Sequence, residues 1–152
     1  MNWNPPDWNM IRRHYAERMD RIIEAGALMY GADPYSLESL YEMTPIERSM
    51  WSDIRCMGLV FYPQFPVGRF FVDFGNPVSR VAIECDGKGY HDANRDRERD
   101  EDLARLGWRV YRMSGSACNK CGYDSGDEFG RAKWNGSPGE ELLAAIRKNH
   151  GM

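Results

Sequence analysis

The segment RFFVDFGNPVSRVAIECDG, residues 69–87, contains two apolar runs typical of strands, and both runs carry acidic residues. Asp73 lies inside the first run, and Glu84 and Asp86 close the second. Side chains alternate between the two faces of a strand, so Glu84 and Asp86 share a face of the second strand. The sequence therefore predicts that three carboxylates gather on one face of a sheet.

The turn between the two runs determines how close these acids lie. If Gly75 pairs with Arg80 across the turn, the two strands form an antiparallel hairpin. In that register Asp73 faces Ala82 and lies diagonal to Glu84, at about 7–8 Å between the backbones. Two carboxylates this close repel each other unless a cation lies between them, and Mg²⁺ or Mn²⁺ suits such oxygen ligands. The pattern favours a metal site that activates water for phosphodiester hydrolysis.

A purely structural role for the same acids is the alternative. In that interpretation Asp73 and Glu84 face solvent on an open sheet, or they pair with Arg69 and Arg80. The grouping of three acids on one face, close to an acid-bearing helix and a histidine, favours the metal site.

The elements that position these acids follow from periodicity and capping signals. Thr44, Pro45 and Glu47 form the clearest helix start, with a capping box, and Gly58 ends that helix. Period-two alternation then predicts three strands joined by short turns as an antiparallel meander. We expect helices over residues 8–26, 34–41, 45–57, 93–106 and 139–149, and strands over 59–68, 69–75, 80–86 and 107–113.

Length and composition indicate one soluble α/β domain. The chain has 152 residues, of which 42% are hydrophobic and 28% charged. No apolar run approaches the roughly 18 residues that span a bilayer, and the N-terminus lacks a secretory signal. We therefore expect no membrane partner and a cytoplasmic location. We divide the chain into an N-terminal helical extension (1–43), a core (44–113), and an irregular lobe with a C-terminal helix (114–152).

Four stretches in this order resemble a known group of nucleases: TPIERSMW, QFPVGRFFVDF, VAIECDGKGYH and RDRERDEDLARLGWRVYR. They are similar to the very-short-patch mismatch repair endonucleases and to homing endonucleases built on the same core, which belong to the PD-(D/E)XK superfamily. The resemblance covers about Thr44 to Met113. It implies an α/β core of helix, three strands, helix and strand, with a metal-dependent phosphodiesterase site.

The resemblance assigns roles to individual residues. Asp73 and Glu84 match the two metal-binding acids of the superfamily, and we expect the Cys85 backbone carbonyl as a third ligand. Glu47 matches the acid of the first core helix, which holds the metal through water, and its capping role is the structural alternative. His91 matches a candidate general base, whereas a plain surface loop residue is its alternative.

One position departs from the superfamily pattern. Asp86 stands where the superfamily usually has a lysine, so the expected ExK motif is ExD in this chain. Lys88, two residues further on, is a candidate replacement. Asp86 itself would support the metal site or bind a second ion.

DNA is the partner that this resemblance implies. Candidate substrate contacts are Gln64, Lys88, Tyr90, Arg95 and Arg99, the last two of which would reach a phosphate or orient a site acid. The net charge is −3, which is unusual for a polyanion binder, but it becomes +1 once the four site acids are set aside. A monomer would nick DNA and a dimer would cut both strands, and the sequence does not choose between them. A catalytically silent module that binds nucleic acid or another partner on the same fold is the alternative function.

The cysteines are a separate question. Cys118 and Cys121 form a CNKC stretch with zinc-ligand spacing, but a structural zinc site needs four ligands. Two reduced thiols are the preferred interpretation, and a structural Zn²⁺ is the alternative. Cys85 points with Val81 and Ile83, so we expect it in the core.

Overall fold

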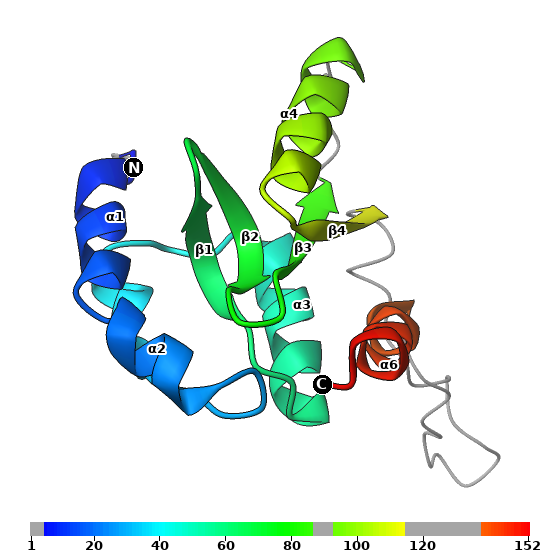
Figure 1. The fold of residues 1–152 in the computed structure, drawn as a ribbon, viewed down its shortest axis with the longest axis horizontal. Coiled ribbons are helices and arrows are strands. Elements are labelled where there is room, and N and C mark those ends of the chain that lie inside the picture. Colours follow the sequence, from blue (N-terminus) through cyan, green and yellow to red (C-terminus); the bar gives the residue numbers. More distant parts are fainter. Residues whose placement is uncertain (1–4, 87–92, 115–137) are drawn as a thin grey trace, which may run out of the picture.

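The computed structural model describes residues 5–86, 93–114 and 138–152 of the chain. Within these residues, one four-stranded sheet is flanked by helices (Figure 1). The predicted mixed α/β fold is therefore confirmed. The elements in chain order are α1 (Trp8–Ala16), α2 (Met19–Ala25), the 3₁₀ helix η1 (Ser36–Ser39), α3 (Pro45–Met57), β1 (Tyr62–Val67), β2 (Phe70–Asn76), β3 (Val81–Asp86), α4 (Ala93–Arg105), β4 (Arg109–Ser114) and α6 (Pro138–His150).

The helix expected over residues 8–26 is two helices, so that prediction is wrong in its length. Asp7 caps α1 by accepting the N–H of Met10 at 3.1 Å, and a turn separates α1 from α2. Because of this turn, Ile11 and Ile22 are both fully buried in the same apolar cluster. Apolar periodicity continues through such a break and does not reveal the change of direction. The short helix expected over residues 34–41 is the 3₁₀ helix η1.

Helix α3 begins and ends where its capping residues predict. The Thr44 hydroxyl accepts the N–H of Glu47 at 3.3 Å, and Pro45 occupies the first helical position, where its missing N–H is not needed. Gly58 ends the helix in the left-handed conformation at φ 69°, which glycine adopts without steric cost. Glu47 is thereby held in the first turn, at the end of α3 nearest to β1 and β2.

The sheet has the order β1-β2-β3-β4. The first three strands form the predicted antiparallel meander, and β4 pairs parallel to β3. A parallel pair needs a crossover, and α4 is that connection. Helix α4 therefore lies beside the strand that carries Glu84 (Figure 1).

The assumed register of the β2–β3 hairpin is wrong by two residues. Gly75 pairs with Ala82 instead of Arg80, and Asn76 pairs with Val81. The cause is Asn76, whose Oδ1 accepts the N–H groups of Val78 at 3.1 Å and Ser79 at 3.2 Å. This side chain closes a turn one residue later on each strand than assumed, as asparagine commonly does in turns.

Asn76 also joins the hairpin to the rest of the fold. It is 1% exposed, and its Nδ2 donates to the carbonyl oxygens of Ala27 at 3.0 Å and Val60 at 2.9 Å. Asn76→Ala would leave these backbone groups without their partner. We expect it to lower the free energy of unfolding by about 2–4 kcal/mol, measured by urea denaturation. Asn9→Ala, at an exposed position of α1, is the control and should change stability by less than about 0.5 kcal/mol; a loss for Asn76→Ala as small as this would contradict the prediction.

Two apolar clusters hold the layers together. One joins α1, α2 and α4 to the sheet through residues such as Ile11, Tyr15 and Leu103. The other joins α3 and α6 to the sheet, with Ile54 and Leu143 fully buried. Residues 5–43 are therefore packed into the same core as the strands. None of the helices in the described ranges is both long and apolar enough to cross a membrane.

Candidate active site

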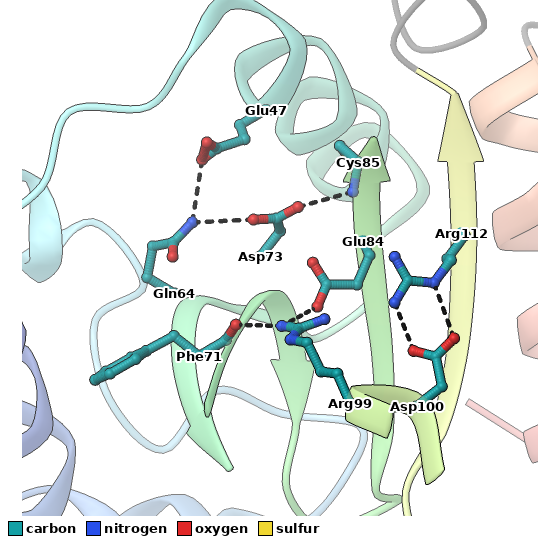
Figure 2. Close-up of polar contacts among 9 residues, drawn as sticks. All are labelled: Glu47, Gln64, Phe71, Asp73, Glu84, Cys85, Arg99, Asp100 and Arg112. Carbon is teal, nitrogen blue, oxygen red and sulfur yellow. Dashed lines mark hydrogen bonds and ion pairs between the residues drawn. The ribbon is translucent and has the colours of Figure 1, made fainter. Parts of the chain in front are cut away.

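Three predicted site acids come together where β2 and β3 separate. The ladder between these strands reaches Phe74↔Ile83, and beyond this pair the Asp73 Oδ2 accepts the N–H of Cys85 at 2.8 Å (Figure 2). The carboxylate thus replaces a backbone acceptor at the point where the strands part. Glu84, the residue before Cys85, lies beside Asp73 in this opening. With the observed strand pairing, Asp73 and Glu84 lie closer to each other than in the diagonal arrangement that was assumed from the sequence.

Gln64 links the acid of α3 to the acid of β2. Its Nε2 donates to Glu47 Oε2 at 3.1 Å and to Asp73 Oδ1 at 3.3 Å (Figure 2). Gln64 is 4% exposed and has a φ of 49°, which is uncommon for a residue with a side chain. Its neighbours Pro63 and Pro66 have fixed φ angles, which restricts the backbone around it. Gln64 was predicted to contact substrate. In the structure it lies between the carboxylates of Glu47 and Asp73 and donates a hydrogen bond to each of them.

Glu47 is buried at 7% exposure and held by three neighbours. The Tyr41 hydroxyl lies 2.8 and 2.9 Å from its two oxygens, and the Thr44 hydroxyl donates at 3.1 Å. Burial raises the pKa of Glu47, the Tyr41 hydrogen bond opposes this, and the charge of Asp73 adds to it. Burial and the contact with Glu47 also raise the pKa of Tyr41, so its phenol keeps the proton that it donates. Sequence reasoning missed Tyr41, because nothing in its local pattern indicates a partner six residues away.

Glu84 is the most strongly perturbed acid of this group. Burial, with the negative charge of Asp73 as the next cause, raises the pKa of Glu84 to about 8, although the Arg99 guanidinium opposes the shift. Arg99 Nη2 lies 2.5 Å from Glu84 Oε1, and the same nitrogen donates to the Phe71 carbonyl at 2.7 Å (Figure 2). This one guanidinium faces a group that also contains the carboxylate of Asp73 and, beyond Gln64, that of Glu47. The site therefore holds more negative charge than its own cation balances.

This imbalance predicts that the metal-free protein gains stability when Glu84 loses its charge. The raised pKa means that the stabilising effect of protonation is complete below about pH 4.5 and is lost as the pH rises to about 8. Glu84→Gln imitates the protonated form, so we expect it to raise the free energy of unfolding by about 1–3 kcal/mol at pH 8 in EDTA. Glu101→Gln, an exposed site on α4, is the control. An unchanged or lower stability of Glu84→Gln in chemical denaturation would refute the prediction.

Ion pairs attach α4 to the sheet beside the site. Asp100 Oδ1 lies 2.5 Å from Arg112 Nη2 on β4, and Asp102 Oδ2 lies 2.9 Å from Arg69 Nη2 before β2 (Figure 2 shows the first pair). Leu103 is the fully buried apolar residue of this polar helix. Arg69 thus pairs with α4 and does not neutralise Asp73, which was its structural alternative.

The described donor atoms fit a divalent cation. Asp73 and Glu84 supply hard carboxylate oxygens, and Glu84 is buried at 6% exposure, where a carboxylate charge is costly unless a cation lies close to it. Within residues 5–86, 93–114 and 138–152, no three His, Cys, Asp or Glu side chains are grouped closely enough to hold a metal ion. A third ligand would therefore come from the backbone, from water or from a phosphate, as is usual for Mg²⁺.

Several predicted site residues lie outside the described residues. Lys88, Tyr90 and His91 belong to this group, as do both cysteines with zinc-ligand spacing, Cys118 and Cys121. The backbone of Asp86 ends β3, but its side chain is outside the description. Arg95 is exposed on α4, one turn before Arg99. Cys85 packs against the cluster of α3 and α6, as its predicted core position requires.

A family model and a solved structure are similar to parts of this chain. Residues 46–120 match the family model named REase_MTES_1575, a restriction endonuclease-like family. The catalytic domain of the homing endonuclease I-Bth0305I is a structural neighbour with 23% identity and a TM-score of 0.45, covering 51% of this chain and 82% of that domain. No curated protein is significantly similar to the chain. The family match, which includes Glu47, Asp73, Glu84 and Arg99, supports a nuclease with a restriction endonuclease-like fold.

Proposed function

We propose that this protein is a metal-dependent endonuclease that hydrolyses phosphodiester bonds of DNA. The observation that carries the proposal is the opening between β2 and β3, where Asp73 and the buried Glu84 lie side by side. A strand pair that only had to be stable would not place two carboxylates together and raise the pKa of one of them. Paired acids of this kind are suited to hold a cation that a phosphate also contacts.

The chain's own residues divide into those that hold the cation and those that support them. Asp73, Glu84 and the Cys85 carbonyl would hold Mg²⁺ or Mn²⁺, which when bound polarises the phosphate and lowers the pKa of water. Glu47 and Asp86 would support the site through water or a second ion. Gln64 keeps the carboxylates of Glu47 and Asp73 apart by donating to both.

Other residues would act on the attacking water and on the DNA. His91 would accept the proton of the attacking water, because a neutral imidazole is a suitable base near neutral pH. Lys88, Tyr90 and Arg95 would contact the DNA next to the cleaved bond. The net charge of −3 comes largely from the site acids, so a bound cation would reverse the local sign where the phosphate lies.

A plasmid-nicking assay tests the proposal. Supercoiled DNA should be converted to nicked or linear DNA in the presence of Mg²⁺ or Mn²⁺ and should stay intact in EDTA. Conversion to nicked DNA alone indicates a monomeric enzyme, whereas direct linearisation indicates cutting by a dimer. DNA that is bound but stays intact with every divalent cation tested would instead establish the silent binding module.

A second comparison tests the narrower resemblance to very-short-patch repair endonucleases. Duplexes that differ only in one mismatched base pair should be cut at different rates if the chain shares that specificity. If matched and mismatched duplexes are cut at equal rates, the chain is still an endonuclease, but its cleavage does not depend on a mismatch.

A further inference from the structure

The Arg99 guanidinium directly contacts the site acid Glu84. It reaches from α4 to Glu84 on β3 and to the Phe71 carbonyl on β2, and it therefore spans the opening between these strands (Figure 2). Its side chain is 22% exposed, so it lies at the surface of the site. Both contacts use Nη2, and a guanidinium has five N–H groups in a rigid fork. The other N–H groups are not needed for these two contacts.

Most of the lysines of the chain lie outside the described residues. The chain has four lysines, Lys88, Lys120, Lys133 and Lys148, and in the described residues only Lys148 appears, in the last turn of α6. Arg112, the other arginine close to Glu84, has its guanidinium engaged by Asp100. Arg99 is therefore the positively charged group that the described fold brings to the acids.

Attachment of α4 to the sheet does not require the Arg99 contact. Asp100 pairs with Arg112, Asp102 pairs with Arg69, and Leu103 is fully buried. Arg99 pairs with Glu84, whereas the neighbouring carboxylate of Asp73 is held by Gln64 and by the Cys85 N–H. A purely structural ion pair does not require a second carboxylate beside it, since like charges repel.

We propose that Arg99 is a displaceable counter-ion of Glu84, which competes with the metal cation for this acid and then binds the phosphate of the DNA substrate. The inference rests on the proposed function. Two cations that share one carboxylate oxygen repel each other, so Arg99 lowers the affinity of Glu84 for metal as long as it stays there. Once it leaves Glu84, its planar fork matches two phosphate oxygens and can bind both at once.

The direction in which Arg99→Gln changes metal affinity distinguishes this role from a structural one. If Arg99 merely orients Glu84 as a ligand, Arg99→Gln weakens metal binding. If Arg99 competes with the metal, the same change strengthens it, by about thirtyfold when the unit charge of Arg99 lies near 4 Å from a divalent ion and is screened as in water. Arg105→Gln makes the same charge change on the same helix, at a side chain that is 72% exposed and pairs with Glu101 and Asp102. It should leave metal affinity within about twofold of wild type.

The experiment uses the full chain and two readouts. Calorimetric titration with Mn²⁺ gives the metal affinity of wild type, Arg99→Gln, Arg99→Lys and Arg105→Gln. We expect tighter binding for Arg99→Gln alone, because lysine retains the charge. DNA binding in Ca²⁺ should show a salt dependence reduced by about one phosphate contact for Arg99→Gln. Weaker or unchanged Mn²⁺ binding by Arg99→Gln overturns the proposal, as does an unchanged salt dependence.

Two further measurements keep the test independent of folding and of cleavage. If Arg99→Gln does not fold, the side-chain Nε–H signal of Arg99 in wild-type protein, assigned with Arg99→Lys, should shift on addition of Mg²⁺; no shift overturns the proposal. If wild type cuts no DNA, the endonuclease proposal fails, while the Mn²⁺ affinities still decide the competition. If wild type cuts DNA and Arg99→Gln cuts at the wild-type rate at saturating metal, the phosphate role fails alone.

Discussion

Asp73→Asn is expected to abolish cleavage and metal binding together. The asparagine oxygen can still accept the Cys85 N–H that Asp73 accepts at 2.8 Å, so the opening between β2 and β3 should keep its shape. The variant loses the negative charge that a divalent cation requires. Because the metal contributes several kcal/mol to such a reaction, single-turnover cleavage should fall by about 10³-fold or more.

The matching measurement is calorimetric titration with Mn²⁺ on both proteins. Asp20→Asn, on the exposed side of α2, makes the same chemical change away from the site and should match wild type in both assays. Equal metal affinity of Asp73→Asn and wild type would remove Asp73 from the metal site. Since the variant retains the backbone hydrogen bond, a loss of metal affinity without a loss of thermal stability would support the assigned role.

His91→Ala is expected to slow cleavage by about 10²–10⁴-fold, the usual range for a positioned acid–base group. A general base acts in the transition state, so metal and DNA affinities should change little. This pattern differs from that of Asp73→Asn, which loses metal affinity as well. Cleavage within about threefold of wild type at saturating Mg²⁺ would show that His91 is a loop residue.

The pH dependence gives a second test of the same role. A base must be neutral to accept a proton, and an ordinary histidine loses its proton near about pH 6.5. The wild-type rate should therefore rise with pH across this range, and His91→Ala should lack this rise. Measurements at saturating Mg²⁺ keep metal occupancy constant, so that changes at the acids do not produce the same profile. A rise of equal size in both proteins would contradict the assignment.

The order and type of the elements around the site followed from local sequence signals. Thr44, Pro45 and Gly58 marked the ends of α3, because capping depends on residues within a few positions. Alternation placed Asp73 and Glu84 on one face even though the register was wrong by two residues. A shift of two leaves every side chain on its original face, because the strand period is also two. The break between α1 and α2 was not predictable, since apolar periodicity does not record the direction of a helix axis.

The sequence therefore determined which acids belong to the site, whereas tertiary packing determined their charged and hydrogen-bonded neighbours and the pKa of Glu84. The acids themselves were identifiable from charge within apolar strands. The hydrogen-bond partners around these acids could not be identified from the sequence. Gln64 and Glu47 are 17 positions apart in the chain, and Arg99 and Phe71 are 28 positions apart. Such contacts depend on how α3 and α4 pack on the sheet, which the polar sequence of α4 does not specify. Burial of Glu84, which raises its pKa, likewise exists only after these layers have assembled.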